Sequence, residues 1–209
     1  MRRTKFAATI AVALAGYVVP VHGQDQWRFG VKAGPTVSSV STDLDYINPQ
    51  RRDGFSGVVF AKWDIGAPVR LVGEAGYAER GYKGAGAICR DQPSDCTSWT
   101  YSRPFRYVSL ASLIESPITS LGSTELYLLA GPRFNVLLCC SETGEPEPGY
   151  GYAENTWEAT AGAGAAMTRG RLPLLLEARV NLGLSDALEG DWAEPAYHRS
   201  FDIMLGFAF

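Results

Sequence analysis

Residues 200–209 place a large apolar side chain at every second position, and this alternation is the strongest constraint on the fold of the chain. The residues between the apolar positions are polar, small or flexible. A period of two is the period of a β-strand, so the segment predicts a strand with one strongly apolar face. Such a face needs a covering layer or lipid against it. Its members are Phe201, Ile203, Leu205, Phe207 and Phe209.

Seven earlier segments also alternate like strands, and nothing beyond residue 23 is apolar for the roughly 18 residues of a transmembrane helix. Short connections at residues 65–68, 115–123 and 169–171 alternate with long ones. This sorting of connections, with an even number of strands, is typical of outer-membrane barrels. The sequence therefore predicts an all-β fold, an eight-stranded antiparallel transmembrane up-and-down β-barrel, built from residues 27–40, 54–64, 69–82, 105–114, 124–138, 154–168, 172–185 and 200–209.

The two faces of the predicted strands differ in their chemistry. One face is apolar, with aromatic residues near the strand ends that resemble the girdles at membrane interfaces: Trp27, Trp63, Phe207 and Phe209 at one end, Phe55, Tyr77, Phe134 and Trp157 at the other. The other face has charges of both signs. Side chains fill the interior of an eight-stranded barrel, so these charges predict a paired network in a filled lumen. The network residues are Arg28, Lys32, Glu74, Arg80, Glu125, Arg133, Glu158, Glu177, Arg179 and Asp202.

The start of the chain has the pattern of a secretory signal peptide. Arg2, Arg3 and Lys5 form a basic leader, residues 6–19 form an apolar run, and residues 21–23 include small side chains suited to cleavage. We expect residues 1–23 to be removed, leaving an outer-membrane β-barrel domain over residues 24–209. Cleavage removes three of the 19 basic residues and none of the 22 acidic ones, so a nucleic-acid partner is not expected.

The tripeptide Ala-Gly-Pro occurs twice, at residues 33–35 and 130–132, within two of the predicted strands. Proline cannot donate a ladder hydrogen bond, and a closed barrel has no free edge on which to place it. We therefore predict a bulge at each site. The repetition also indicates an internal repeat.

Three short motifs resemble the PorT-like outer-membrane β-barrel family: Phe29-Gly30-Val31-Lys32-Ala33-Gly34, Gly73-Glu74-Ala75-Gly76-Tyr77 and Ala130-Gly131-Pro132-Arg133-Phe134. The resemblance spans essentially the whole chain after residue 23. It implies a barrel in the outer membrane of a Gram-negative bacterium, with periplasmic termini and extracellular long loops. The final strand also resembles the closing strand of bacterial outer-membrane barrels. That likeness implies that Phe209 is a signal for the barrel-assembly machinery, which joins outer-membrane lipid as an expected partner.

Four cysteines fall in the predicted loops, Cys89 and Cys96 in the longest one and Cys139 and Cys140 at the start of the next. A secreted chain favours disulfides, and four cysteines allow three pairings. Cys89 with Cys96 is the local pairing, a vicinal Cys139–Cys140 bridge is strained, and pairing across the two loops is also feasible. Since only one histidine lies beyond the signal segment, we predict no metal site, and no cofactor.

The last strand offers an enzymatic alternative. His198, Ser200 and Asp202 share one face, and they resemble the His-x-Ser pair and acid of outer-membrane enzymes that deacylate lipid A. In a serine hydrolase the acid must orient the histidine, yet Asp202 lies beyond Ser200. All three residues also share the lumen-facing parity, whereas lipid chemistry needs the outer face. The sequence therefore favours a protein that is not an enzyme.

These patterns together predict a non-catalytic outer-membrane barrel with a structural or surface-interaction role, not a general porin. A lipid A deacylase-like enzyme is the first alternative. A soluble lipocalin-like ligand-binding barrel is the second, and it would place the apolar face inside. The acidic loops at residues 142–154 and 186–194 contain aromatic residues and are available to a protein or surface partner, although they lack calcium-loop spacing.

Overall fold

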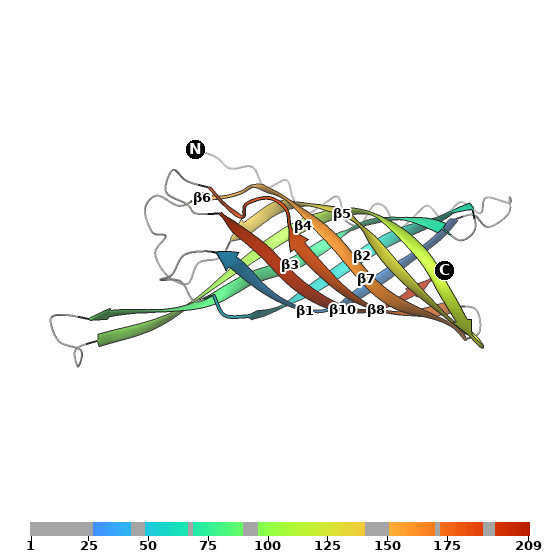
Figure 1. Ribbon diagram of the computed structural model, residues 1–209, viewed down its shortest axis with the longest axis horizontal. Coiled ribbons are helices and arrows are strands. Elements are labelled where there is room, and N and C mark those ends of the chain that lie inside the picture. Colours follow the sequence, from blue (N-terminus) through green and yellow to red (C-terminus); the bar gives the residue numbers. More distant parts are fainter. Residues whose placement is uncertain are drawn as a thin grey trace.

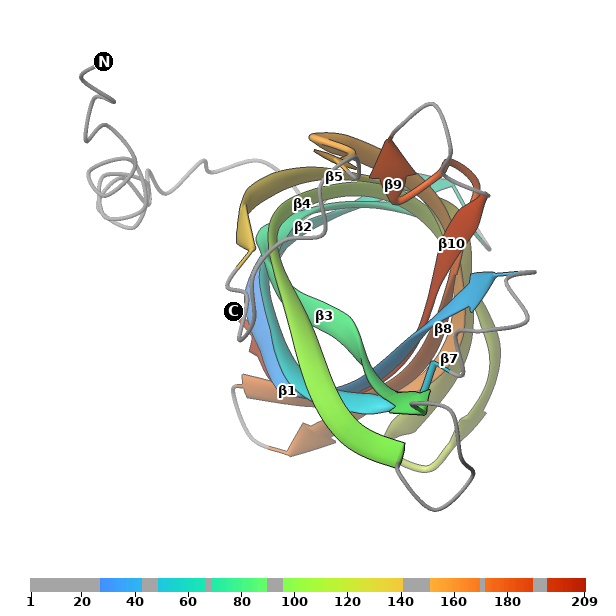
Figure 2. The same ribbon diagram turned by 90° about the vertical axis from the view of Figure 1, so that its left-hand side faces the viewer.

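The computed structural model describes residues 27–42, 49–66, 69–89, 96–140, 151–169, 172–189 and 195–209. Eight antiparallel strands close into one ring, shown from the side in Figure 1 and along the barrel in Figure 2. The predicted fold class is therefore confirmed. The barrel strands are β1 (Trp27–Thr42), β2 (Arg52–Gly66), β3 (Val69–Cys89), β4 (Cys96–Leu121), β5 (Thr124–Cys140), β7 (Asn155–Arg169), β8 (Leu172–Gly183) and β10 (Ala196–Ala208).

Each barrel strand pairs with its neighbour along the chain, and β1 pairs with β10 to close the ring. Two short strands, β6 (Gly151–Tyr152) and β9 (Leu188–Glu189), pair with each other outside the barrel sheet. We call the end where β2 meets β3, β4 meets β5 and β7 meets β8 the turn end, and the opposite end the loop end. The final residue, Phe209, lies at the turn end, where its backbone exchanges hydrogen bonds with Phe29.

Burial alternates with the period of two that the sequence predicts. In β10 every second residue from Ala196 to Ala208 is buried, and the residues between them are exposed. The exposed positions are large and apolar except for Arg199, and the buried positions include His198, Ser200 and Asp202. The barrel is therefore apolar on the outside and largely polar inside, the reverse of a soluble lipocalin-like barrel. Among the described residues, no helix has the length and apolar character needed to cross a membrane.

The hairpin of β3 and β4 is much longer than the sequence predicts. We expected strands at residues 69–82 and 105–114 joined by the longest loop, but pairing continues outward to Cys89 opposite Cys96. Figure 1 shows this hairpin running past the other strands at the loop end. Gly81, with φ of 140°, lies where β3 continues beyond its ladder with β2, whose last pair is Ser56 with Ala78.

The connection from β4 to β5 is correspondingly shorter than expected. The sequence predicts a turn over residues 115–123, whereas the structure has a tight turn at Gly122 and Ser123. Gly122 has a φ of 63°, in the left-handed region that glycine adopts without cost. Glu115 consequently belongs to a strand and faces the lumen, where it is almost fully buried.

The two Ala-Gly-Pro segments are not bulges. Pairing of β1 with β10 keeps the same register before and after Gly34 and Pro35, and pairing of β4 with β5 does the same around Gly131 and Pro132. Each proline lacks an N–H donor for the ladder, but no extra residue is inserted into either strand. The register shifts in these ladders lie elsewhere, for example between Arg106 and Tyr107.

Candidate functional site: the filled lumen and its two mouths

The centre of the lumen contains a network of ion pairs that joins strands from opposite walls. Arg179 on β8 donates from Nη1 and Nη2 to the two carboxylate oxygens of Glu74 on β3, at 2.6 and 2.7 Å. Lys32 on β1 donates to Glu74 at 2.7 Å and to Glu177 at 2.8 Å. The hydroxyl of Tyr127 on β5 donates to the same oxygen of Glu177. Both carboxylates are thus held by several charged or polar donors, which is the arrangement that makes buried charges tolerable.

A second set of ion pairs extends from this network to the turn end. Lys62 Nζ lies 2.5 Å from Glu115 Oε2 and sits 4.7 Å from the centre of the Tyr127 ring. Arg70 bonds Glu115 at 3.1 Å and forms a two-pronged contact with Glu125. An apolar cluster lies beside these charges in the turn-end half of the lumen: Phe60, Val72, Leu113, Tyr127, Leu129, Leu175 and Ala208.

The loop-end half of the lumen is less completely paired. Arg80 on β3 bonds Glu158 on β7 through Nη1, while Arg80 Nε and Nη2 and Glu158 Oε2 have no hydrogen-bond partner among the described residues. Arg133 on β5 approaches Asp202 and Glu74 only at 3.7 and 3.9 Å. Every one of these side chains is buried, so the charges of this half remain enclosed by the barrel wall.

An aromatic cluster closes the loop end of the lumen. Its buried members are Val40, Tyr82, Phe105, Tyr107 and Ala196, and Tyr101, Leu137 and Tyr152 pack against them. The ring of His198 lies edge-on to Phe105 and Tyr107, at 5.2 and 5.7 Å between centroids. Arg103 donates to the Tyr152 hydroxyl at 2.8 Å and lies over the Tyr101 ring. The lumen is therefore filled by charged side chains in its middle and by rings at this end.

The residues of the possible hydrolase triad lie in the lumen but engage other partners. His198 Nε2 shares a hydrogen bond of 2.9 Å with the Tyr107 hydroxyl. Asn181 Nδ2 donates to Ser200 Oγ and to Asp202 Oδ2, both at 2.9 Å, and Thr36 donates to the other Asp202 oxygen. No hydrogen bond joins His198 to Ser200 among the described residues, and His198 Nδ1 has no acid beside it within bonding distance. The geometry thus lacks the base–nucleophile contact that a serine hydrolase uses.

The structure places most of the predicted network residues inside the barrel. Lys32, Glu74, Arg80, Arg133, Glu158, Glu177, Arg179 and Asp202 are buried. Glu125 is partly exposed at the turn end, and Arg28 is exposed there with no ion pair or hydrogen bond among the described residues. Arg70 and Glu115 also belong to this network and were not predicted, although Arg70 has the same strand parity as Glu74, a signal that it points inward.

The roles predicted for the four cysteines and for Phe209 are not tested by the described contacts. The side chains of Cys89, Cys96, Cys139 and Cys140 lie outside the described residues, so disulfide pairing stays a prediction. Phe209 is 63% exposed on the outer face, and its role in assembly stays a prediction as well. Within the described ranges, no group of three or more His, Cys, Asp or Glu side chains is placed to hold a metal ion.

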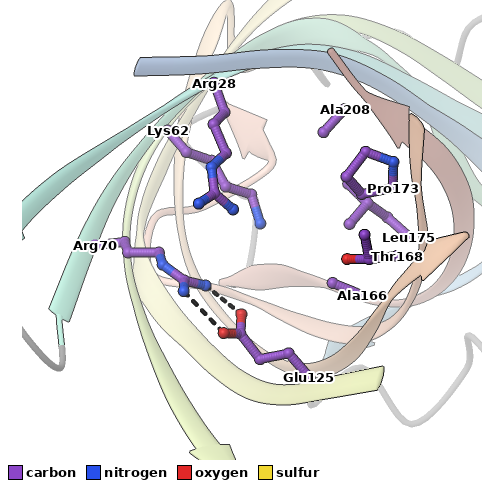
Figure 3. A pocket seen from close by; sticks show the side chains of 9 residues that line it. All are labelled: Arg28, Lys62, Arg70, Glu125, Ala166, Thr168, Pro173, Leu175 and Ala208. Atoms are coloured by element: carbon purple, nitrogen blue, oxygen red, sulfur yellow. Dashed lines mark hydrogen bonds and ion pairs between the residues drawn. The ribbon is translucent and has the colours of Figure 1, made fainter. Parts of the chain in front are cut away.

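A small cavity opens at the turn-end mouth of the lumen (Figure 3). Its empty space, including the open mouth, is about 470 Å³. Arg28, Lys62 and Arg70 line one side, and Pro173, Leu175 and Ala208 line the other. Arg70 is fixed by Glu125 at the edge of the cavity, while Arg28 and Lys62 extend into it (Figure 3).

The outer face is a continuous apolar surface. Aromatic rings pair at both ends of it: Trp27 stacks on Trp63 at the turn end with centroids 5.3 Å apart, and Phe134 contacts Trp157 toward the loop end at 4.8 Å. Large exposed side chains between these ends include Val31, Val59, Leu110, Ile114, Leu128, Leu176, Val180, Ile203 and Leu205. A water-soluble protein rarely exposes apolar area on this scale, whereas lipid covers it.

Comparison with solved structures places this architecture among bacterial outer-membrane barrels. Neisserial surface protein A has a TM-score of 0.52 and 15% identity over 86% of this chain and 95% of its own. The outer-membrane protein OprG of Pseudomonas aeruginosa has a TM-score of 0.50 and 9% identity over 87% and 95%. Ail, the attachment invasion locus protein of Yersinia pestis, has a TM-score of 0.46 and 14% identity over 88% and 99%.

These likenesses concern the fold, because the identities are too low to transfer an activity or a ligand. No family model matches the sequence, and no curated protein matches it. The chain is an eight-stranded transmembrane β-barrel. The chemistry of its lumen must therefore be interpreted from its own residues.

Proposed function

We propose that this protein is an integral outer-membrane barrel with a structural or surface-interaction role. The observation that supports this most strongly is the exposed apolar belt around a closed ring whose charges face inward. Burial of apolar surface is worth about 25 cal/mol per Å². The large number of exposed apolar side chains therefore strongly favours a position in lipid over one in water. The two aromatic pairs at the ends of the belt suit the membrane interfaces.

The role proposed here is not that of a general porin. A diffusion pore needs a continuous water-filled path, and such paths are found in barrels with many more strands. In this barrel Arg179 and Glu74 join across the lumen, and the ring of Phe105 lies in the aromatic cluster at the loop end. These contacts support a closed lumen.

The protein is also proposed to be non-catalytic. Ser200 and His198 are bonded to Asn181 and Tyr107 instead of to each other, and both are buried on the lumen side. A lipid A deacylase-like enzyme is the alternative. It would require these side chains to leave their present partners and to meet a lipid that lies on the opposite side of the barrel wall.

We further propose that the turn end faces the periplasm and that the loop end faces outward. Short periplasmic turns and longer extracellular connections are the usual arrangement in such barrels. The long β3–β4 hairpin then projects from the cell surface, where it is available to a protein or surface partner. Residues 142–150 and 190–194 of the acidic loops lie outside the described residues, and their part in such binding stays a prediction. Membership of the PorT-like family and recognition of Phe209 by the barrel-assembly machinery belong to the same proposal.

Cell fractionation tests the central claim. The protein expressed in a Gram-negative host should sediment with outer membranes and should require detergent for extraction. Recovery in the soluble periplasm without detergent would contradict membrane insertion.

Labelling of single cysteines introduced at Ser123 and at Lys83, in a background without the native cysteines, tests orientation. A membrane-impermeant reagent applied to intact cells should modify the Lys83→Cys protein and not the Ser123→Cys protein, and the reverse result would invert the topology.

A further inference from the structure

Two cations face each other across β1 and β2 at the turn-end mouth of the lumen. Arg28 on β1 is directly opposite Lys62 on β2 in the antiparallel register, and both side chains extend into the cavity there (Figure 3). Like charges directly opposite each other on neighbouring strands destabilise a sheet. An anion between them would remove that repulsion, so this pair indicates a place where negative charge is favoured.

The carboxylates near the mouth compensate these cations unevenly. Lys62 is held by Glu115 at 2.5 Å, and Arg70 bonds Asp64, Glu115 and Glu125. Arg28 has no ion pair or hydrogen bond within the described part of the chain, and it is exposed to solvent. A guanidinium has five N–H donors in a planar fork that matches a carboxylate or a phosphate. Arg28 is therefore the cation of this mouth whose donors are open to a ligand.

The wall opposite the cations is largely apolar, with Thr168 as its polar member. Pro173 and Leu175 on β8 and Ala208 on β10 belong to it, and Leu175 is also part of the buried apolar cluster behind the mouth. The empty space between the two walls, about 470 Å³, includes the open solvent of the mouth, so the enclosed part admits only a small ligand. A ligand that satisfies both walls has an anionic group at one end and a short apolar body at the other.

We propose that the turn-end mouth binds a small organic anion, a carboxylate or a phosphate monoester on an apolar body of a few carbon atoms. Arg28 provides the main contact through its guanidinium fork. Lys62 and Arg70 supply additional positive potential, and the wall of Pro173, Leu175 and Ala208 receives the apolar body. The site lies at the turn-end edge of the ion-pair network, with which it shares Lys62 and Arg70, and it faces away from the outer surface. It goes beyond the structural role proposed above and does not depend on it.

Titration of the refolded full-length barrel in a non-ionic detergent tests this site, with butyl phosphate, butyrate, inorganic phosphate and butylammonium as probes at constant ionic strength. Isothermal titration calorimetry gives the affinity, and fluorescence of the stacked Trp27 and Trp63, next to Arg28 and Lys62 along their strands, gives a local signal. Butyl phosphate and butyrate should bind, and inorganic phosphate should bind several-fold more weakly than butyl phosphate. Absence of binding by both organic anions, or equal binding of butylammonium, would overturn the proposal. Equal affinity for inorganic phosphate would overturn the apolar half of the site.

A pair of variants then assigns the contact. Arg28→Gln should weaken organic-anion binding about tenfold or more, the loss expected for hydrogen bonds to a charged group. Arg199→Gln, which removes an exposed arginine of β10 that does not line the cavity, should leave the affinity unchanged. Equal affinities in the wild-type and Arg28→Gln proteins would remove Arg28 from the site and contradict the proposal. Because Arg28 is exposed, both variants are expected to refold.

Discussion

Arg179 and Glu74 form a bidentate ion pair across the lumen, from β8 to β3, two strands that are not neighbours in the barrel. Both side chains are buried, and Lys32 and Glu177 complete the group. The pair ties opposite walls together without any backbone contact between them. Removal of this pair therefore measures how much the filling of the lumen contributes to the stability of the barrel.

Replacement of Arg179 by Leu should destabilise the barrel by about 3–5 kcal/mol, because Glu74 and Glu177 then stay buried with Lys32 as their hydrogen-bonded cation and with Arg133 only within 3.9 Å of Glu74. Urea-induced unfolding from lipid vesicles measures this change. Arg199→Leu is the control, since Arg199 is exposed on the outer face. Equal midpoints for the two variants would mean that the buried ion pairs contribute little.

Purified barrel in planar lipid bilayers should show no stable openings of porin size. The charged network and the aromatic cluster around Phe105 and Tyr107 fill different depths of the lumen, so neither depth leaves a wide aqueous path. A porin measured in the same bilayers is the positive control. Reproducible large openings from the monomer would show that the lumen rearranges in the membrane.

Gly34→Ala and Gly131→Ala should each destabilise the barrel by about 1–3 kcal/mol, the usual cost of an added methyl group without space. A Cβ on Gly34 would lie 2.9 Å from the carbonyl carbon of Ile203, and one on Gly131 would lie 2.9 Å from Leu113 Cα. Both contacts are with the backbone of the neighbouring strand, which cannot move aside easily. The measurement is the midpoint of urea unfolding.

Gly73→Ala is the matched control for these two variants. A Cβ at Gly73 meets no atom within 4 Å, so its midpoint should be unchanged or slightly higher. A loss of stability in Gly73→Ala as large as in Gly34→Ala would show that strand glycines matter here through backbone flexibility and not through close approach.

Ser200→Ala should leave lipid A unchanged in cells that express the protein. Ser200 Oγ accepts a hydrogen bond from Asn181 and is not bonded to His198, so its loss removes one buried polar contact and no nucleophile. Mass spectrometry of extracted lipid A, with an empty-vector strain as reference, makes the comparison. Loss of an acyl chain from lipid A in the wild-type strain alone would favour the enzymatic alternative.

Peptide mapping under non-reducing conditions should find Cys89 linked to Cys96. The backbone register sets the two residues directly opposite each other on β3 and β4. Opposed residues of antiparallel strands have Cα atoms roughly 4.5–5.5 Å apart, within the span of a disulfide. A link from either residue to Cys139 or Cys140 would instead support a bridge between the two loop-end connections.

The sequence predicts the fold well where strands have one face in lipid and one in the lumen. The alternation in residues 200–209 matches the burial of β10 residue by residue. The same alternation predicts the β3–β4 hairpin poorly. Beyond Gly81 the outer face no longer needs large apolar side chains, so the period of two fades from the sequence. Pro117 near the end of β4 also suggests a turn that the structure places later, at Gly122. Glu115 falls in the predicted turn over residues 115–123, whereas the structure places it in β4 facing the lumen.

The candidate site is less accessible from sequence than the fold. A period of two tells which face a residue occupies, but it does not tell which residue of another strand it meets. Arg133 is directly opposite Glu158 in the ladder, yet Glu158 pairs with Arg80 from β3. Partners across a barrel depend on the tilt and stagger of all strands together. The exposed position of Arg28 at the mouth has the same origin.

The closure of β1 on β10 has a consequence for the order in which the barrel forms. Every other ladder of the barrel joins successive barrel strands, whereas the bond from Thr36 to Asp202 spans 166 positions. Contacts of high sequence separation form slowly, because the entropy of loop closure must be overcome first. Until this last ladder forms, β1 and β10 each present an unpaired edge that can pair with another chain. The rate of closure therefore sets how long the folding barrel is vulnerable to aggregation.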